Sequence, residues 1–391
     1  MSKIVFFCIP AHGHTNPTLP VVKELVALGH EVYYYSFNEF KEKLENAGAH
    51  FISCDHIDLG LEETENAGDR VGKDIVFSTE LIAKATLAMD DFAMEEIKAL
   101  QPDVIVGDSV AYWGKLTAMK LGVPFVSSTT TFAFNQYSSR IMKQSIWDLF
   151  KMIFQMPKTG KILQPLRDKG YPAENVLSIV QNDNETNTVV YTSKEFQPFA
   201  ETFSDKYAFV GPCIREAGEE IVKTGEKLIY ISLGTVNNQF VDFYKNCVNA
   251  FAGTDYQVIM SVGKDTDINA LGELPENISV YPSVDQIGVL RKADVFLSHC
   301  GMNSASESLY HGVPLVMFPQ TQEQGGVAYR VGEVGAGIRL EKTDSGSIKA
   351  AVEAVLGDKI YKENAGKIAE SFKKSGGAKE AAQAILRAVR K

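Results

Sequence analysis

Two histidines and an aspartate follow predicted buried strands early in the chain. The apolar run Ile4–Ile9 predicts a strand, and His12 and His14 come shortly after it. A second predicted strand, 104–106, leads to Asp108. The carboxyl ends of parallel strands share one sheet edge, so a histidine and Asp108 that meet there could act as a proton-transfer pair. The alternative is that His14 and Asp108 only cap the helices that follow them.

A second set of polar side chains lies in the stretch 294–324. Here an apolar run, a glycine-centred turn, a helical segment and another apolar run follow one another without a break. The run 295–297 predicts a buried parallel strand, and Gly301 falls where the backbone turns from strand into helix. We expect that helix to begin at Asn303 or Ser304, because both are residue types that cap helices.

The predicted helix start is suited to binding an anion. Ser304-x-x-Glu307 matches a capping box and so supports a helix that begins at this point. The positive end of the helix and its unpaired N–H groups would then face the turn, where a phosphate would sit well. His299, the first residue after the strand, could add a hydrogen bond to that phosphate. In the structural alternative, Glu307 only completes the cap and His299 is a packing residue.

Composition and charge limit the classes of protein that fit this chain. A length of 391 residues with 45% hydrophobic residues fits two globular domains. The formal net charge of −10 argues against a nucleic-acid partner or an anionic membrane surface, because both attract basic proteins. The five cysteines are scattered and form no C-x-x-C pair, which favours a reducing cytoplasm over a disulfide framework or a zinc site. Neither a signal peptide nor a membrane-spanning helix is expected, since no apolar run is long enough.

The regular alternation of predicted strands and helices indicates an α/β fold with doubly wound parallel sheets. It divides the chain into a first domain at 1–210, a polar linker at 211–227 and a second domain at 228–375. The turn after the first strand lacks G-x-G-x-x-G, which disfavours a dinucleotide oxidoreductase, and no P-loop motif occurs in the chain.

The polar motifs carry a resemblance to a known family. The pattern H-C-G-x-N-S-x-x-E at 299–307, followed by E-Q at 323–324, resembles the donor-nucleotide signature of GT-B glycosyltransferases of the UDP-glycosyltransferase type, family 1. The pattern P-x-x-G-H-x-x-P at 10–17 is similar to the catalytic pattern of that family. The resemblance covers essentially the whole chain. Within the family, the chain most resembles the bacterial macrolide and natural-product branch. It implies two Rossmann-like doubly wound domains facing a cleft, and a C-terminal helix at 376–391 that crosses back to the N-terminal domain.

The resemblance also implies roles for the site residues. His14 would be the general base that takes a proton from the acceptor hydroxyl, and Asp108 would orient its imidazole. The donor diphosphate would contact Thr235, His299, Gly301, Asn303 and Ser304, the ribose hydroxyls Glu307, and the sugar hydroxyls Glu323 and Gln324. Many relatives carry Asp-Gln where this chain has Glu-Gln, so the sugar preference is left open.

The stretch that would hold the donor base departs from the family. Relatives commonly carry Trp-x-Pro-Gln at this place, and the indole ring stacks on the base. Here the stretch reads Ser283-Val284-Asp285-Gln286, so the ring is missing. We therefore expect backbone contacts around Val284 and Gln286 to hold the base, with weak discrimination between bases.

The stretch 131–156 is rich in Phe, Tyr, Met and Trp. One interpretation is a packed helix pair. The other is an apolar wall for a small acceptor, formed by Phe132, Phe134, Tyr137 and Met142. The two interpretations are equally well supported by the sequence.

The activity that the resemblance implies is an inverting, metal-independent transfer of a hexose, first of all glucose, from a UDP-sugar to a hydroxyl of a small apolar acceptor. Such acceptors include flavonoids, phenols, macrolides and other natural products. The UDP-sugar would be a co-substrate, and no cofactor is expected; the D-x-D pattern at 265–267 is too short to indicate a metal site. The alternatives are a nucleotide-sugar 2-epimerase of the same fold and a catalytically silent partner protein, and the intact His14 and Asp108 argue against the second.

Overall fold

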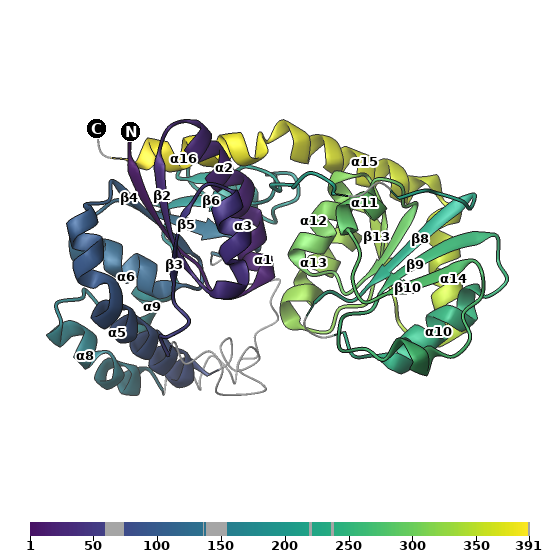
Figure 1. The fold of residues 1–391 in the computed structure, drawn as a ribbon, viewed down its shortest axis with the longest axis horizontal. Coiled ribbons are helices and arrows are strands. Elements are labelled where there is room, and N and C mark those ends of the chain that lie inside the picture. The colour runs from purple at the N-terminus through teal and green to yellow at the C-terminus, as the bar shows by residue number, and fades with distance from the viewer. Residues whose placement is uncertain (59–73, 136, 138–154, 219–220, 236–237, 390–391) are drawn as a thin grey trace. The chain divides into compact units, whose positions relative to one another are not determined.

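The computed structural model of the protein describes residues 1–58, 74–135, 137, 155–218, 221–235 and 238–389 (Figure 1). They form two compact units. The first comprises Met1–Ser193, Phe199–Cys213 and Ser375–Lys391, and the second comprises Lys194–Pro198 and Ile214–Lys374. Met142, which was predicted to line the acceptor wall, lies outside the described residues.

The first unit is built on a seven-stranded sheet with the order β3-β2-β1-β4-β5-β6-β7, in which neighbouring strands pair in parallel. Its strands are β1 (Lys3–Phe7), β2 (Glu31–Ser36), β3 (His50–Ser53), β4 (Val104–Asp108), β5 (Phe125–Thr129), β6 (Asn187–Val190) and β7 (Tyr207–Phe209). The chain runs outward from β1 to β3 and then returns to β4 on the other side of β1. Such a reversal creates a switch point, where open α/β sheets bind their ligands beyond the carboxyl ends of the strands.

Helices cover both faces of this sheet, which explains why its strands read as continuous apolar runs. The helices are α1 (His12–Thr15), α2 (Leu19–Ala27), α3 (Lys41–Asn46), α5 (Ile75–Leu100), α6 (Tyr112–Leu121), α8 (Gln164–Asp168), α9 (Val176–Val180) and α16 (Gly377–Ala388). Along β1, Phe6 packs into the core that α2 and α16 close, whereas Phe7 packs into the core of α5 and α6. Figure 1 shows α16 lying beside α2 in this unit.

The second unit has a six-stranded sheet with the order β10-β9-β8-β11-β12-β13, again paired in parallel. Its strands are β8 (Lys227–Ser232), β9 (Tyr256–Ser261), β10 (Ile278–Tyr281), β11 (Val295–Ser298), β12 (Leu315–Met317) and β13 (Gly337–Arg339). Its helices are α10 (Val241–Phe251), α11 (Gln286–Leu290), α12 (Met302–Tyr310), α13 (Gln322–Glu333), α14 (Ser345–Gly357) and α15 (Lys359–Lys374). Here the switch point lies between β8 and β11. The predicted pair of doubly wound parallel sheets is therefore confirmed.

Residues 194–198 lie within the predicted first domain but belong to the second unit. The reason is a set of contacts with α13 and α15. Arg330 donates hydrogen bonds from its guanidinium to the backbone oxygens of Glu195 and Phe196, and the ring of Phe196 packs edge-on against Phe372 at 5.6 Å. Within the described ranges, no helix combines the length and the hydropathy that crossing a membrane requires.

Candidate active site

The switch point of the first sheet brings His14 and Asp108 together. His14 lies in α1, which follows β1, and Asp108 is the last residue of the neighbouring strand β4. The Nδ1 atom of His14 is 2.7 Å from Oδ2 of Asp108. The Asp108 side chain is 2% exposed and that of His14 is 22% exposed. A buried carboxylate thus holds one nitrogen of an imidazole that still reaches the surface, as the shared sheet edge predicted, while their catalytic roles stay a prediction.

The second oxygen of Asp108 has a structural task. Oδ1 accepts a hydrogen bond from the backbone N–H of Val110 at 3.0 Å, in the turn that leads into α6. The carboxylate therefore shapes a turn with one oxygen and contacts His14 with the other. A third polar group was missed by sequence reasoning: Oγ1 of Thr130 is 3.2 Å from Nδ1 of His14. Thr130 directly follows β5, the next strand along the same edge, and this position was the signal that could have found it.

The second histidine of α1 does not join this pair. Nε2 of His12 lies 2.8 Å from Oε1 of Glu39, and its ring contacts Phe40 edge-on at 5.0 Å. Its contacts are therefore with the segment that follows β2. His14 is the histidine of α1 that contacts Asp108.

The predicted acceptor residues fall into two groups. Phe132 is buried, with 6% exposure, whereas Phe134 and Tyr137 are 45% and 41% exposed. Asn135 supports this segment, because its Nδ2 donates to Oγ1 of Thr202 at 2.7 Å and its Oδ1 accepts from the backbone N–H of Tyr137 at 2.9 Å. Phe134 and Tyr137 thus present ring surface that an apolar molecule could contact, and their role stays a prediction.

At the switch point of the second sheet, the helix after β11 begins earlier than predicted. Gly301 is the N-cap residue with extended backbone angles, and α12 begins at Met302, so the predicted start at Asn303 or Ser304 is wrong. Ser304 instead lies in the first turn of the helix. The left-handed residue that turns the chain is Cys300, with φ 62°.

The predicted capping box in α12 is also wrong. The carboxylate of Glu307 accepts a 2.6 Å hydrogen bond from Nε2 of Gln286, a residue at the start of α11. The same Nε2 lies 3.5 Å from Oγ of Ser304, and Oε1 of Gln286 accepts from the hydroxyl of Tyr230 at 3.2 Å. Burial raises the pKa of Glu307. The structure thus joins three predicted donor-binding residues, and it adds Tyr230, which sits in a buried apolar strand and gave no sequence signal.

His299 lies between two glycine loops. A Cβ atom placed on Gly234, in the loop after β8, would lie 2.7 Å from Cε1 of the imidazole. A Cβ on Gly301 would lie 2.6 Å from Nε2. Burial lowers the pKa of His299 to about 4, so the ring is neutral at neutral pH. The neighbouring predicted residue, Thr235, follows Gly234 and is exposed.

The remaining predicted donor residues occupy two further strand ends. Ser283 is exposed and Val284 half-buried, after β10. Glu323 is exposed in the first turn of α13, after β12. Gln324 is already engaged, because its Oε1 accepts from the backbone N–H groups of Gln320 and Thr321 at 2.8 and 3.3 Å. Its own backbone N–H donates to Oγ1 of Thr321 at 3.3 Å, which completes a capping box.

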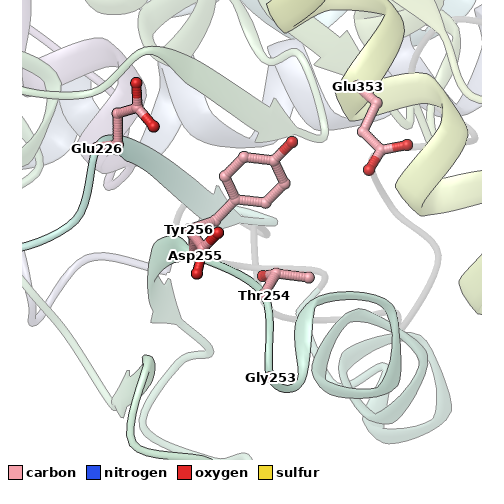
Figure 2. Close-up of a pocket in the computed structure, with 6 residues that line it drawn as sticks. All are labelled: Glu226, Gly253, Thr254, Asp255, Tyr256 and Glu353. Carbon is pink, nitrogen blue, oxygen red and sulfur yellow. The ribbon is translucent and has the colours of Figure 1, made fainter.

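Two further acidic features lie in the second unit. Asp267 of the D-x-D pattern caps a short 3₁₀ helix, Ile268–Leu271, by accepting from the backbone N–H of Asn269 at 3.0 Å. A separate pocket is lined by Glu226, Gly253, Thr254, Asp255, Tyr256 and Glu353 (Figure 2). Glu226 and Asp255 directly precede β8 and β9, so this pocket lies at the amino edge of the sheet and is not part of the candidate site.

Known proteins resemble this chain over nearly its whole length. Residues 245–387 match the family model of the erythromycin biosynthesis protein CIII-like C-terminal domain. The chain is 37% identical over 383 residues to the NDP-glycosyltransferase YjiC of Bacillus subtilis, covering 96% of this chain and 95% of that protein. It is 27% identical over 410 residues to the oleandomycin glycosyltransferase of Streptomyces antibioticus, covering 98% and 90%.

Solved structures agree with these sequence relatives. The calicheamicin glycosyltransferase CalG4 superposes with a TM-score of 0.82 at 26% identity, covering 99% of this chain and 98% of that one. The kitacinnamycin glycosyltransferase superposes with a TM-score of 0.86 at 26% identity, covering 100% and 99%. The fold and the relatives thus define a glycosyltransferase of the GT-B class. The chain belongs to the bacterial natural-product branch of the family 1 glycosyltransferases.

Proposed function

We propose that this glycosyltransferase moves glucose from UDP-glucose to a hydroxyl group of a small apolar natural product, with inversion at the anomeric carbon. The observation that carries the proposal is the 2.7 Å contact between His14 and the buried Asp108. A relative that is 33% identical is named an uncharacterized UDP-glucosyltransferase, and one that is 27% identical is named an oleandomycin glycosyltransferase, which supports the substrate classes. Because its five cysteines are all free thiols, we also place the protein in the cytoplasm.

In this proposal His14 acts as a general base. With Nδ1–H donated to the Asp108 carboxylate, Nε2 carries the lone pair that accepts the proton of the acceptor hydroxyl. The acceptor oxygen bonds to the anomeric carbon while the bond from that carbon to the diphosphate oxygen breaks, and the electron pair leaves with the nucleoside diphosphate. Asp108 then stabilises the imidazolium by its negative charge. One in-line displacement of this kind converts an α-linked donor into a β-glycoside.

The donor-binding part of the proposal rests on the loop between β11 and α12. The backbone N–H groups that point out of the first turn of α12, together with the helix dipole, favour the diphosphate. The neutral imidazole of His299 would donate one further hydrogen bond without adding a fixed charge. Glu307, a half-buried carboxylate one turn further along α12, would accept hydrogen bonds from the ribose hydroxyls. Glu323 and Gln324 at the start of α13 would contact the sugar.

The test is an incubation of the protein with UDP-glucose, with and without a phenolic acceptor such as a flavonoid, followed by mass spectrometry. We expect a glycoside and release of UDP that depends on the acceptor, with a β linkage in the proton NMR spectrum of the product. Isomerised nucleotide sugar in the absence of acceptor would indicate a 2-epimerase instead. No turnover with any acceptor or donor would indicate a silent partner protein.

A further inference from the structure

The region beside Glu307 is where the donor base would lie, if the proposed function holds. The diphosphate would sit at the start of α12 and the ribose at Glu307. Glu307 contacts Gln286, the first residue of α11, and Asp285 precedes it. The base is attached to the ribose on the side away from the diphosphate. It would therefore reach the segment around 285–286.

Arg215, which is distant in sequence, contacts the segment 285–286. The guanidinium of Arg215 forms an ion pair with Asp285 through Nη2 and Oδ1, across 70 positions of sequence. The other carboxylate oxygen, Oδ2, accepts a 2.7 Å hydrogen bond from the backbone N–H of Gly218. Asp285 thus fixes both Arg215 and the backbone that follows it.

The guanidinium is held at its edges and is open to solvent. Nη1 of Arg215 donates to the backbone oxygen of Glu216 at 3.1 Å, while Nη2 faces Asp285. The Arg215 side chain is nevertheless 51% exposed, and that of Asp285 only 10%. Bonds in the plane of the guanidinium fix its orientation without covering its faces. The positive charge of Arg215 also acts on Glu307, the proposed ribose contact. It opposes the rise in the pKa of Glu307 that burial causes.

Two unusual residues occur together in this segment. Position 283 carries serine, so no aromatic ring is available there for stacking, and position 285 carries the aspartate that binds Arg215. A guanidinium is planar and weakly hydrated, and it stacks on the flat faces of aromatic groups and bases. Arg215 is thus a flat group, held in place and exposed, at the position where the donor base needs a partner.

We propose that the guanidinium of Arg215, held by Asp285, supplies the surface on which the base of the donor nucleoside diphosphate stacks. This inference rests on the proposed function and names the residue that binds the base in the same site. Stacking of this kind depends on the presence of a base and on the planar shape of the side chain. It does not depend on charge alone.

The experiment compares the binding of UDP and of inorganic pyrophosphate to the wild type and three variants by calorimetry. We expect Arg215→Ala to weaken UDP binding roughly tenfold, within the range known for loss of one stacking partner. Arg215→Lys should lose nearly as much, because it keeps the charge but not the plane. Pyrophosphate binding should change little in both variants. Arg291→Ala is the matched control, since Arg291 is an exposed arginine at the other end of α11.

The outcomes separate the inference from the proposed function. Unchanged UDP binding in Arg215→Ala, or full recovery in Arg215→Lys, would overturn the stacking role while leaving the proposed function in place. An equal loss for UDP and pyrophosphate would also overturn it, because Arg215 would then act through its charge. If the wild type binds no nucleoside diphosphate, the proposed function fails and the inference fails with it. Circular dichroism of each variant confirms that it is folded.

Discussion

The imidazole of His299 occupies the space that a side chain at Gly234 would need. The two residues follow neighbouring strands, β8 and β11, at the switch point of the second sheet. A Cβ on Gly234 would lie 2.7 Å from Cε1 and 2.8 Å from Nε2 of the ring. Because Gly234 has no side chain, the imidazole of His299 can lie in this space. We propose this histidine as a diphosphate contact.

We expect Gly234→Ala to displace His299 and to weaken binding of UDP. Gly234 also has a φ of +83°, so alanine there adds backbone strain of about 1–2 kcal/mol. Gly29→Ala is the matched control, because Gly29 has a φ of +84° with open space around its Cβ position. Thermal unfolding and calorimetric titration with UDP check the prediction. Both variants should lose similar stability, and only Gly234→Ala should lose affinity; equal affinities would contradict the role assigned to this contact.

His14→Ala should slow the transfer to aliphatic alcohols by about 10²–10⁴-fold, since such hydroxyls do not ionise without a base. Transfer to a nitrophenol should fall less, because this acceptor ionises on its own. Asp108→Asn should be milder than His14→Ala, because the imidazole stays in place, although the support of the imidazolium and of the Nδ1–H tautomer is lost. The measurement is kcat/KM for one alcohol and one nitrophenol.

The control for this series is His12→Ala. His12 lies in the same short helix α1, but it pairs with Glu39 rather than with Asp108. Its removal should leave kcat/KM for both acceptors close to the wild-type values. If His14→Ala reduces the rates for the alcohol and the nitrophenol equally, His14 is not the base.

Asp90 gives the first unit a stability that depends on pH. Its side chain is 11% exposed and contacts Lys120, Lys169 and Tyr171. Burial alone would raise the pKa of Asp90, but the hydrogen bonds from these three side chains outweigh it and lower the pKa to about 2. A folded-state pKa below the unfolded value of about 3.9 means that this stability is present above pH 4 and is lost between pH 4 and 2.

Asp90→Asn should therefore reduce the free energy of unfolding at pH 7 by about 2 kcal/mol. The difference from the wild type should shrink as the pH falls through 4 toward 2. Urea unfolding at a series of pH values measures this difference. A constant difference over that range would show that Asp90 stabilises the fold through packing and not through its charge.

The residues that meet at the carboxyl edge of the first sheet could be predicted from the sequence, because apolar runs indicate where β1 and β4 end. His14 follows the first of these ends and Asp108 is the last residue at the second, so their meeting needed no knowledge of side-chain packing. The start of α12 was misplaced for a different reason. Cys300 turns the chain in a left-handed conformation that glycine usually takes, and Gly301 next to it is extended.

Long-range contacts explain the other misses. The S-x-x-E pattern suggested a capping box, yet Glu307 bonds to Gln286, 21 positions away. Arg215 lies in a stretch that has no periodic pattern, and its partner Asp285 is 70 positions away. Local propensity carries no information about such pairs. The packing of α11 against α12 brings the first pair together, and the course of the linker brings the second pair together. Thr130 was closer to being predictable, because its strand end belongs to the same edge.

The final prediction concerns the choice of donor base. Neither serine at 283 nor a stacked guanidinium at 215 distinguishes uracil from thymine, because both bases present a similar flat face. We expect kcat/KM for TDP-glucose and UDP-glucose to agree within roughly tenfold, which corresponds to about 1.4 kcal/mol. Ser283→Trp should lower KM for both donors by adding a ring to the same segment. A preference of the wild type for UDP-glucose above about a hundredfold, equal to about 2.7 kcal/mol, would contradict the prediction. It would mean that a hydrogen bond to the base edge, or from the 2′ hydroxyl that thymidine donors lack, selects the donor, and not stacking.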